Sequence, residues 1–253
     1  MSTLIRDYER FAKEANEICK GRVYTDHLRR YAYGVDASCY SYLPKVVVKA
    51  EDEREVRRLI RLCQQCGTPF TFRAAGSSLS GQCSSEDVLI VCNDGFKKME
   101  VIDDGKALKC ECGVIGSDAN DLLKPYNRKI GPDPATLATA LVGGILNNNS
   151  SGMCCGTAQN SYKTIRSIRV VLLDGSILDT SDQKSIDQFL KEKPQMVEDI
   201  LQLRKDILAD EELTHLIHHK YKIKNTTGYG LNSLVDFEDI IDIINHLFIG
   251  SEG

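Results

Sequence analysis

Arg73-Ala-Ala-Gly-Ser-Ser-Leu-Ser-Gly-Gln82 is the stretch of sequence that decides the fold prediction. It follows Phe70-Thr-Phe72, a short run typical of a strand. Its glycines let the backbone approach a ligand without a Cβ in the way, and successive N–H groups in such turns form a nest for anions. The alternative is a tight turn between strands. Because the loop is long for a turn and adds serine hydroxyls, we expect it to cradle a polyanionic group.

Two common nucleotide-binding loops are excluded by the residues present. The segment has no lysine, which a P-loop needs on the terminal phosphates. The Gly-x-Gly-x-x-Gly order of nicotinamide-binding folds does not occur after Phe72. The loop therefore suits a pyrophosphate that is bound and not cleaved.

A second segment of small residues begins at Gly131-Pro-Asp-Pro-Ala135 and continues through Leu141-Val-Gly-Gly-Ile-Leu-Asn-Asn-Asn-Ser-Ser-Gly152. Its prolines restrict the backbone to an extended conformation, and its paired glycines allow close packing where a helix starts. The amides and hydroxyls that follow both donate and accept hydrogen bonds, which suits the edge of a flavin or a purine. Alone, this would be an Asn-rich turn with glycine caps. Together, the two segments predict one long ligand held at both ends.

The composition excludes several classes of protein. The chain has 253 residues and a formal net charge of −4, and its basic residues are scattered, which argues against a nucleic-acid partner. The arginines at positions 54, 57, 58 and 61 predict the solvated face of a helix. No apolar stretch reaches the roughly 18 residues that span a bilayer, and the N-terminus lacks the apolar core of a signal peptide. We therefore expect a cytoplasmic protein, or one peripheral to the inner face of the membrane.

The ten cysteines are expected to be mostly free thiols, because no secretory signal accompanies them. Cys63-Gln-Gln-Cys66 has the spacing of a redox or zinc pair, but it falls inside a helical pattern, so Cys63 is expected in the core. Cys110 and Cys112 alternate along a predicted strand. A zinc site built from these two pairs remains an alternative, although no histidine lies nearby, and we predict no metal site.

The apolar periodicity predicts alternating helices and strands. An amphipathic helix is expected from about Leu4 to Cys19, and another is expected to open at Ala50-Glu-Asp-Glu and end at Gly67, a natural C-cap. A hairpin is expected around Asp174-Gly175. Strands are expected at 46–48, 70–72, 88–92 and 107–112, a short helix at 116–123, charged helices at 183–220 and a last apolar stretch at 240–248. We divide the chain into an N-terminal helical extension at 1–42, a first subdomain at 43–101 and a second at 102–253, with residues 183–220 as an insertion.

The two glycine-rich segments and the C-terminal part of the chain resemble a known family. The Arg-x-x-Gly-Ser-Ser-Leu-Ser-Gly-Gln pattern at 73–82 resembles the pyrophosphate loop of FAD-binding domains in the vanillyl-alcohol oxidase and p-cresol methylhydroxylase superfamily. Residues 131–135, the paired glycines and residues 148–152 resemble its second FAD segment. Asn225-Thr-Thr-Gly-Tyr-Gly-Leu-Asn232 and Ile249-Gly-Ser-Glu-Gly253 resemble its D-lactate and glycolate dehydrogenase branch. The resemblance implies an α+β fold, namely a p-cresol methylhydroxylase type FAD-binding domain of two α/β subdomains, with FAD between them.

The resemblance also implies the cofactor-binding residues. Residues 74–78 would wrap the pyrophosphate, and the second segment would lie near the flavin or ribityl chain. Some relatives carry at position 77 a histidine bonded to the flavin; here Ser77 implies non-covalent FAD. Alanines replace common glycines at two positions of the loop, which requires negative φ there. The full predicted set is Arg73, Ala74, Ala75, Gly76, Ser77, Ser78, Ser80, Gly81, Gln82, Pro132, Asp133, Gly143, Gly144, Asn148, Ser151, Gly152, Gly250 and Glu252.

The implied function is that of the FAD-binding part of an enzyme oxidising a 2-hydroxy acid of D-lactate or glycolate type to a 2-oxo acid. Substrate-binding and catalytic residues are expected in a later domain beyond Gly253, so we name no catalytic acid or base, and His215, His218 and His219 are expected as exposed helix residues. Electrons would pass to a quinone, an electron-transfer protein or an iron–sulfur module. The alternatives are an NADPH-dependent UDP-N-acetylenolpyruvoylglucosamine reductase-like enzyme and a non-catalytic FAD-binding module.

Overall fold

The sheet of the first lobe has a fully buried centre. In this computed structural model, which describes residues 6–226 and 228–252, the strand order is β1-β2-β4-β3. Strands β2 (Val46–Lys49), β4 (Val88–Val91) and β3 (Phe70–Arg73) are parallel, and β1 (Val23–Tyr24) adds antiparallel to β2. All four residues of β4 are buried, as expected for an unbroken β-branched and leucine run in a parallel sheet. These strands confirm the expected ones, with β4 lying between β2 and β3.

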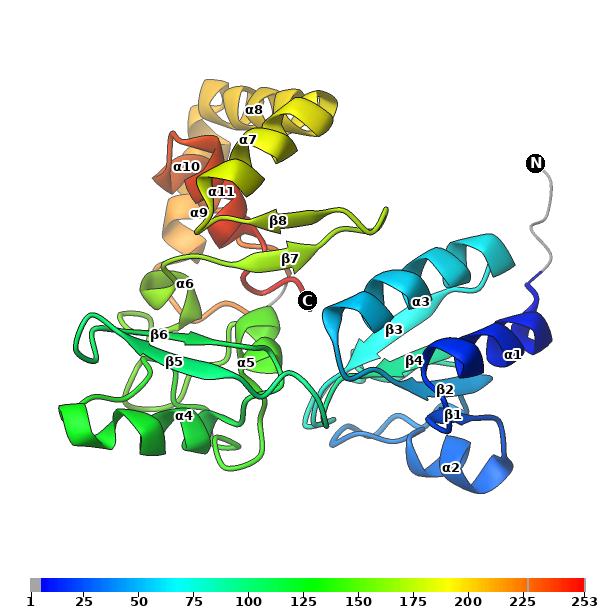
Figure 1. Cartoon of the computed structure of the whole chain (residues 1–253). Coiled ribbons are helices and arrows are strands. Elements are labelled where there is room, and N and C mark those ends of the chain that lie inside the picture. Colours follow the sequence, from blue (N-terminus) through cyan, green and yellow to red (C-terminus); the bar gives the residue numbers. More distant parts are fainter. Residues whose placement is uncertain (1–5, 227, 253) are drawn as a thin grey trace.

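Two helices cover one face of this sheet (Figure 1). Helix α3 (Glu53–Cys66) begins where the Asp52 carboxylate accepts the N–H of Glu55 at 2.8 Å, and it ends at Gly67, whose φ of 64° is left-handed. Cys63 is buried in the core, as predicted. Helix α1 (Tyr8–Ile18) packs on α3 through Phe11 and Ala15. The expected start of the first helix at Leu4 lies outside the described residues, as do Thr227 and Gly253.

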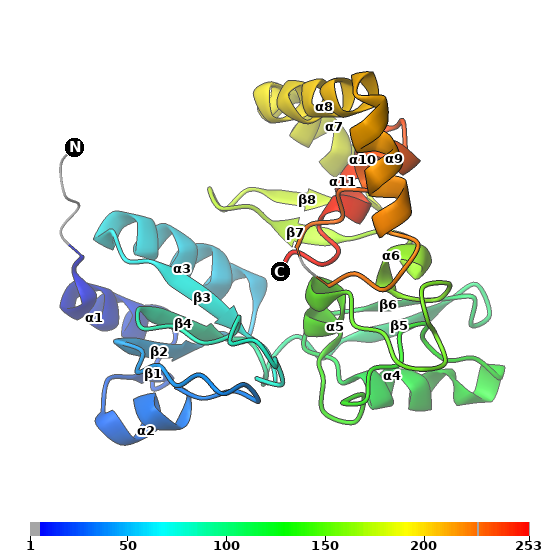
Figure 2. The same ribbon diagram turned by 180° about the vertical axis from the view of Figure 1, so that it is seen from behind.

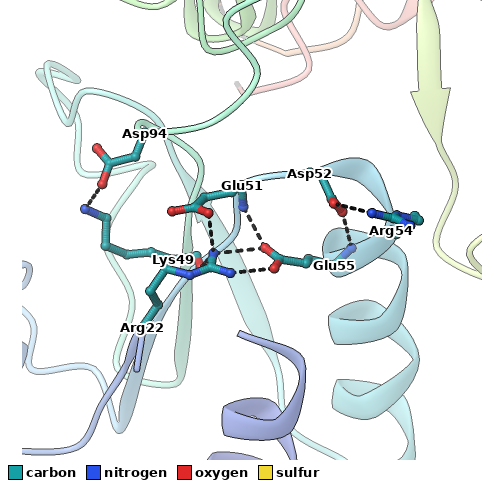
Figure 3. A network of polar contacts seen from close by, with 7 residues as sticks. All are labelled: Arg22, Lys49, Glu51, Asp52, Arg54, Glu55 and Asp94. Atoms are coloured by element: carbon teal, nitrogen blue, oxygen red, sulfur yellow. Dashed lines mark hydrogen bonds and ion pairs between the residues drawn. The ribbon is translucent and has the colours of Figure 1, made fainter. Parts of the chain in front are cut away.

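The segment expected as an N-terminal extension packs against the first sheet, and we propose that it belongs to the first lobe. Besides α1, strand β1 joins the sheet, and α2 (His27–Ala32) lies on the side of the sheet opposite α3 (Figures 1 and 2). The Arg22 guanidinium ties this segment down, because it donates to both oxygens of Glu55 at 2.5 and 2.9 Å and to the carbonyl of Lys49 at 2.8 Å (Figure 3). The first lobe therefore begins with the first described residues.

The second lobe starts with a hairpin that the apolar pattern did not reveal. Strand β5 (Met99–Ile102) pairs antiparallel with β6 (Ala107–Cys110), and the turn between them uses left-handed φ values at Asp103, Asp104 and Gly105. The expected boundary after Val101 falls inside β5. Because β4 and β5 belong to different sheets, we propose residues 92–98 as the connection between the lobes. Four short helical segments follow the hairpin: α4 (Gly116–Leu123), η1 (Lys124–Tyr126), α5 (Val142–Asn148) and α6 (Ser161–Thr164).

A second hairpin and a helical cluster complete the second lobe. Strands β7 (Arg169–Val171) and β8 (Ile177–Asp179) pair as predicted. The helices expected at 183–220 are α7 (Gln183–Glu192), α8 (Pro194–Ala209) and α9 (Glu211–Lys220), and α10 (Ser233–Asp236) and α11 (Ile240–Leu247) follow them. Helix α11 supplies Ile243 and Ile244 to the two cores of this cluster.

The β7–β8 hairpin also contacts the first lobe. Arg57 donates to the carbonyl of Gly175 at 2.7 Å, and Gln64 donates to the carbonyl of Leu173 at 2.8 Å. The arginine face of α3 is therefore only partly solvated, since Arg57 is half-buried against the hairpin. The lobes are joined both by the chain and by this contact.

We expect Phe11→Ala to destabilise the first lobe by about 3–5 kcal/mol, because it leaves a cavity between α1 and α3. Chemical denaturation would measure the loss. Lys13→Ala, an exposed change on the same helix, is the control and should alter stability by less than about 0.5 kcal/mol. Equal stability of the two variants would mean that α1 is a separate extension after all.

Candidate functional site

A long cleft of about 3320 Å³ lies between the lobes. The end of β3, the 74–82 loop, the β5–β6 hairpin, residues 140–151 and residues 248–252 all contribute to its walls. Small-molecule sites usually enclose about 300–1,000 Å³, so this cleft is large enough for an extended dinucleotide.

The first glycine-rich loop takes its shape from Arg73. The arginine guanidinium folds back over Gly76 and donates to the carbonyls of Tyr33 at 3.2 Å and Val35 at 2.8 Å. A Cβ on Gly76 would lie 2.2 Å from this guanidinium, and the φ of Gly76 is +75°. Ala74 and Ala75 are not among the residues with positive φ. This agrees with the expectation that alanine can replace glycine here only where φ is negative. Glycine is thus necessary at 76 and unnecessary at 74 and 75.

The segment before the sheet supports this loop from behind. The Tyr40 ring lies against Gly81, where a Cβ would approach it to 2.9 Å. Asp36 accepts the Cys83 thiol at 3.4 Å and the N–H of Ser38 at 2.8 Å. Residues 33–42, which fall in the expected N-terminal extension, therefore hold the loop in position.

The second glycine-rich segment meets the first. Gly143 packs on Cys112, with its N–H donating to the Cys112 carbonyl at 2.9 Å. A Cβ on Gly144 would lie 3.5 Å from the Cβ of Ala74, so the start of α5 faces the first loop directly. The predicted pair of segments is therefore brought together on one cleft.

Asp133 organises the turn that follows α5. Its carboxylate accepts the N–H groups of Gly152 at 2.9 Å and of Cys154 and Cys155 at 3.2 Å each. The Cys155 thiol, together with these N–H groups, lowers the pKa of Asp133 to about 2. A Cβ on Gly152 would lie 1.9 Å from the Asp133 carbonyl, so this glycine is required by the close approach. Both residues hold the segment in shape from outside the cleft lining.

The last described residues dock on the end of α5. The N–H of Gly250 donates to the Leu146 carbonyl at 3.0 Å, and that of Glu252 donates to the Asn147 carbonyl at 2.7 Å. The Glu252 side chain lines the cleft beside Ser78. Burial raises the pKa of Glu252, although its hydrogen bond with Ser78 opposes the shift. The first glycine-rich loop, the end of α5 and residues 250–252 thus converge near Ser78, although they are far apart in the sequence.

Most of the predicted site residues line the cleft. They are Arg73, Ala74, Ala75, Gly76, Ser77, Ser78, Ser80, Gln82, Pro132, Gly143, Gly144, Asn148, Ser151 and Glu252. Gly81, Asp133, Gly152 and Gly250 do not line it and instead shape the adjoining backbone. The prediction missed Lys224, which reaches the cleft and donates to the Ser151 carbonyl at 3.1 Å. Its signal in the sequence was weak, because a single lysine in a polar loop suggests no partner.

The cleft is lined by carboxylates and basic side chains and also by the thiols of Cys83, Cys92, Cys110 and Cys112. Burial raises the pKa of Cys83 and of Cys110 to about 11, so both are protonated near pH 7. His215, His218 and His219 are exposed on α9, as predicted. Among residues 6–226 and 228–252, no three His, Cys, Asp or Glu side chains are grouped to hold a metal ion. In the same residues, we find no helix with the length and apolar character needed to cross a membrane.

We expect Asp133→Asn to lower the free energy of unfolding at pH 7, because an amide replaces a carboxylate that accepts three N–H groups. The folded pKa lies below the ordinary value of 3.8, so the wild-type advantage should be complete above about pH 4 and shrink as the pH falls toward 2. Thermal unfolding of both proteins at several pH values would measure it. Glu100→Gln, which neutralises an exposed carboxylate of β5, is the control; a constant difference between wild type and Asp133→Asn down to pH 3 would contradict the assignment.

Comparison with known proteins agrees with this geometry. The family model described as the FAD binding domain matches residues 44–181. The chain is similar to the D-2-hydroxyglutarate dehydrogenase of Haemophilus influenzae, with 23% identity over 92% of the chain and 24% of that relative. It is also similar to the glycolate oxidase subunit GlcD of Bacillus subtilis, with 26% identity over 62% of the chain and 34% of that protein. The chain thus spans about a quarter and about a third of the lengths of these relatives.

A solved structure supports the same fold. The structure of p-cresol methylhydroxylase with substrate bound superposes with a TM-score of 0.57 and 16% identity, covering 68% of this chain and 35% of that one. The matched family segment runs from β2 through the first loop, the α5 segment and the β7–β8 hairpin, which supply most of the cleft lining. The chain therefore belongs to the FAD binding domain family and has the FAD-binding fold found in p-cresol methylhydroxylase.

Proposed function

We propose that this chain is the FAD-binding part of a flavin-dependent oxidoreductase that oxidises a 2-hydroxy acid to a 2-oxo acid. The observation that carries the proposal is the meeting of the two glycine-rich segments at Ala74 and Gly144. A cleft with small residues on both walls admits a flat, extended cofactor close to the backbone. When bound, FAD would supply the redox chemistry, and the protein's residues would bind and orient it.

The donors present fit a dinucleotide. Residues 74–78 offer backbone N–H groups and the Ser77 and Ser78 hydroxyls to a pyrophosphate. The α5 segment offers the amide of Asn148 and the hydroxyl of Ser151 to the ring or ribityl groups. Since residue 77 is a serine, we propose that FAD is held without a covalent bond. Lys224 would add a positive charge near Ser151, where it helps to balance the negative charge of the ligand.

The hydroxy-acid substrate is proposed from the relatives. Their names are those of a D-2-hydroxyglutarate dehydrogenase and a glycolate oxidase subunit, and the first aligns with 92% of this chain, enough to require part of the α7–α9 insertion. We further propose that the groups that bind the substrate come from another domain. Electrons would then pass to a quinone, an electron-transfer protein or an iron–sulfur module.

Gly144→Ala should separate cofactor binding from folding. The added methyl meets only the Cβ of Ala74 at an ordinary 3.5 Å, and alanine favours a helix over glycine by about 0.5–1 kcal/mol, so the free protein should be as stable or more stable. We expect FAD affinity to fall at least about tenfold, which corresponds to ~1.4 kcal/mol, because the methyl occupies the cofactor gap. Titration followed by flavin fluorescence would measure the affinity, and thermal unfolding would measure the stability.

Gly143→Ala is the matched comparison. Its methyl would lie 2.7 Å from the Cβ of Cys112, so we expect the free protein itself to be destabilised. If Gly144→Ala binds FAD as tightly as the wild type does, Gly144 does not face the cofactor. A wild-type chain that takes up no FAD at all would refute the proposed function, provided that it is folded.

The substrate class can be tested with the full-length protein that contains this segment. D-lactate, glycolate or D-2-hydroxyglutarate should bleach the flavin absorbance under anaerobic conditions, whereas NADPH should not. Each L-enantiomer of the chiral acids is the control for D-lactate and D-2-hydroxyglutarate. Reduction by NADPH alone would favour the alternative reductase.

A further inference from the structure

The connection between the lobes is packed unusually closely against the first lobe. A Cβ on Gly95 would lie 2.1 Å from the carbonyl oxygen and 2.4 Å from the Cα of Glu51, at the turn before α3. Gly95 is not among the residues with positive φ, so the requirement for glycine is one of space and not of backbone conformation. The main chain of the connection therefore lies directly on the main chain of the first lobe.

The same close packing continues into the second lobe. A Cβ on Gly113, just after β6, would lie 2.2 Å from the carbonyl oxygen of Gly95, and the Gly113 N–H donates to the Phe96 carbonyl at 3.1 Å. Gly143 packs against Cys112, the residue before Gly113, and donates its N–H to the Cys112 carbonyl. The contacts Glu51–Gly95, Gly95–Gly113 and Cys112–Gly143 thus form a continuous path of backbone contacts, which we call the junction path.

The junction path ends at the proposed cofactor site. Gly143 starts α5, and its neighbour Gly144 faces Ala74 of the first loop across the cleft. Ala74 follows β3 and so moves with the first lobe, whereas Gly144 moves with the second. The length of the junction path therefore determines how far apart the two glycine-rich segments lie.

We propose that Gly95 and Gly113 are positioning residues that set the separation of the two cofactor-binding segments, and that the Lys49–Asp94 ion pair holds the connection at this spacing. The proposal rests on the proposed function, since it takes the cleft as the FAD site. Gly95 itself lines the cleft, whereas Gly113 does not, and both act on the spacing through Gly143 and Gly144.

The charged network at the junction keeps both ends of the first contact in place (Figure 3). Lys49, at the end of β2, forms an ion pair with Asp94, the residue before Gly95. Glu51 donates its N–H to the Glu55 carboxylate at 2.8 Å, and the same carboxylate is bound by Arg22. Glu51 is thereby fixed to α3 and Asp94 is fixed to β2. The two backbones that touch at Gly95 are both anchored to the first lobe.

The β7–β8 hairpin is another contact between the lobes. It reaches α3 through polar contacts from side chains, such as Arg57 to the Gly175 carbonyl, and Val171 packs on the core of the first lobe. Long side chains adapt to small shifts, whereas two backbones in contact cannot. The junction path is the stiffer of the two connections.

Gly95→Ala tests the proposal directly. Increasing the 2.1 Å contact to 3.0 Å requires a displacement of about 1 Å at the junction. A misplacement of that size can reduce the efficiency of a preorganised site by about 100-fold, so we expect the dissociation constant for FAD to rise about 10- to 100-fold. Gly21→Ala is the control, because it strains a residue with φ of +74° in the first lobe but meets nothing within 4 Å. It should lose some thermal stability and keep FAD affinity within about twofold of the wild type.

The ion pair provides a second set of variants that do not crowd the backbone. Asp94→Asn should speed FAD dissociation by up to about fivefold, the range expected for a partly exposed pair. The double variant Lys49→Asp/Asp94→Lys should restore the wild-type rate, which a loss of general stability would not do. Stopped-flow fluorescence after displacement of FAD would measure these rates.

The outcomes separate this proposal from the proposed function. FAD binding by the wild type with weakened binding by Gly95→Ala, at a thermal stability no lower than that of Gly21→Ala, supports the junction path. If Gly95→Ala does not fold, the ion-pair variants decide. FAD that dissociates more slowly from the charge-swapped double variant than from Asp94→Asn then supports the junction path. Wild-type FAD binding by Gly95→Ala, or equal dissociation rates for wild type and Asp94→Asn, overturns the proposal while leaving the FAD site in place.

Discussion

The close contact between the backbones of Glu51, Gly95 and Gly113 is the constraint on which the cleft depends. It joins two sheets that share no hydrogen bond in their ladders, and it does so where a side chain would hold them apart. The charged residues around it, from Arg22 to Asp94, anchor the participating segments to the buried core of the first lobe. The cleft thus lies beside segments that are anchored to a buried core.

The cleft itself combines two kinds of glycine. Gly76 is needed for its left-handed backbone and for the arginine that lies over it, and so it shapes one wall. Gly144 has free space on its cleft side and leaves the other wall open. Around them, Tyr40, Asp133 and the docked C-terminal residues fix the loops that carry the donors. The shape of this cleft therefore depends on residues that hold the backbone as well as on residues that line it.

Much of the local structure could be predicted, because it depends on neighbours in the sequence. The apolar runs of β2 and β4, the Gly67 cap and the helices α7 to α9 follow from propensity and periodicity. Strand β5 was missed because Met99–Ile102 mixes charged and apolar residues and gains its strand structure by pairing with β6. The role of residues 33–42 was also missed, since their contacts with Arg73 and Gly81 are distant in the sequence.

The sequence by itself determined the class of ligand, because loops without lysine, rich in glycine and serine, can receive a pyrophosphate and cannot drive its cleavage. It also determined that the alanines at 74 and 75 must keep negative φ. Only the tertiary structure decided which of the predicted residues face the cleft and which, like Asp133 and Gly81, hold the loops from behind. The physical reason is that a side chain's direction depends on what packs against it, and those partners come from other parts of the chain.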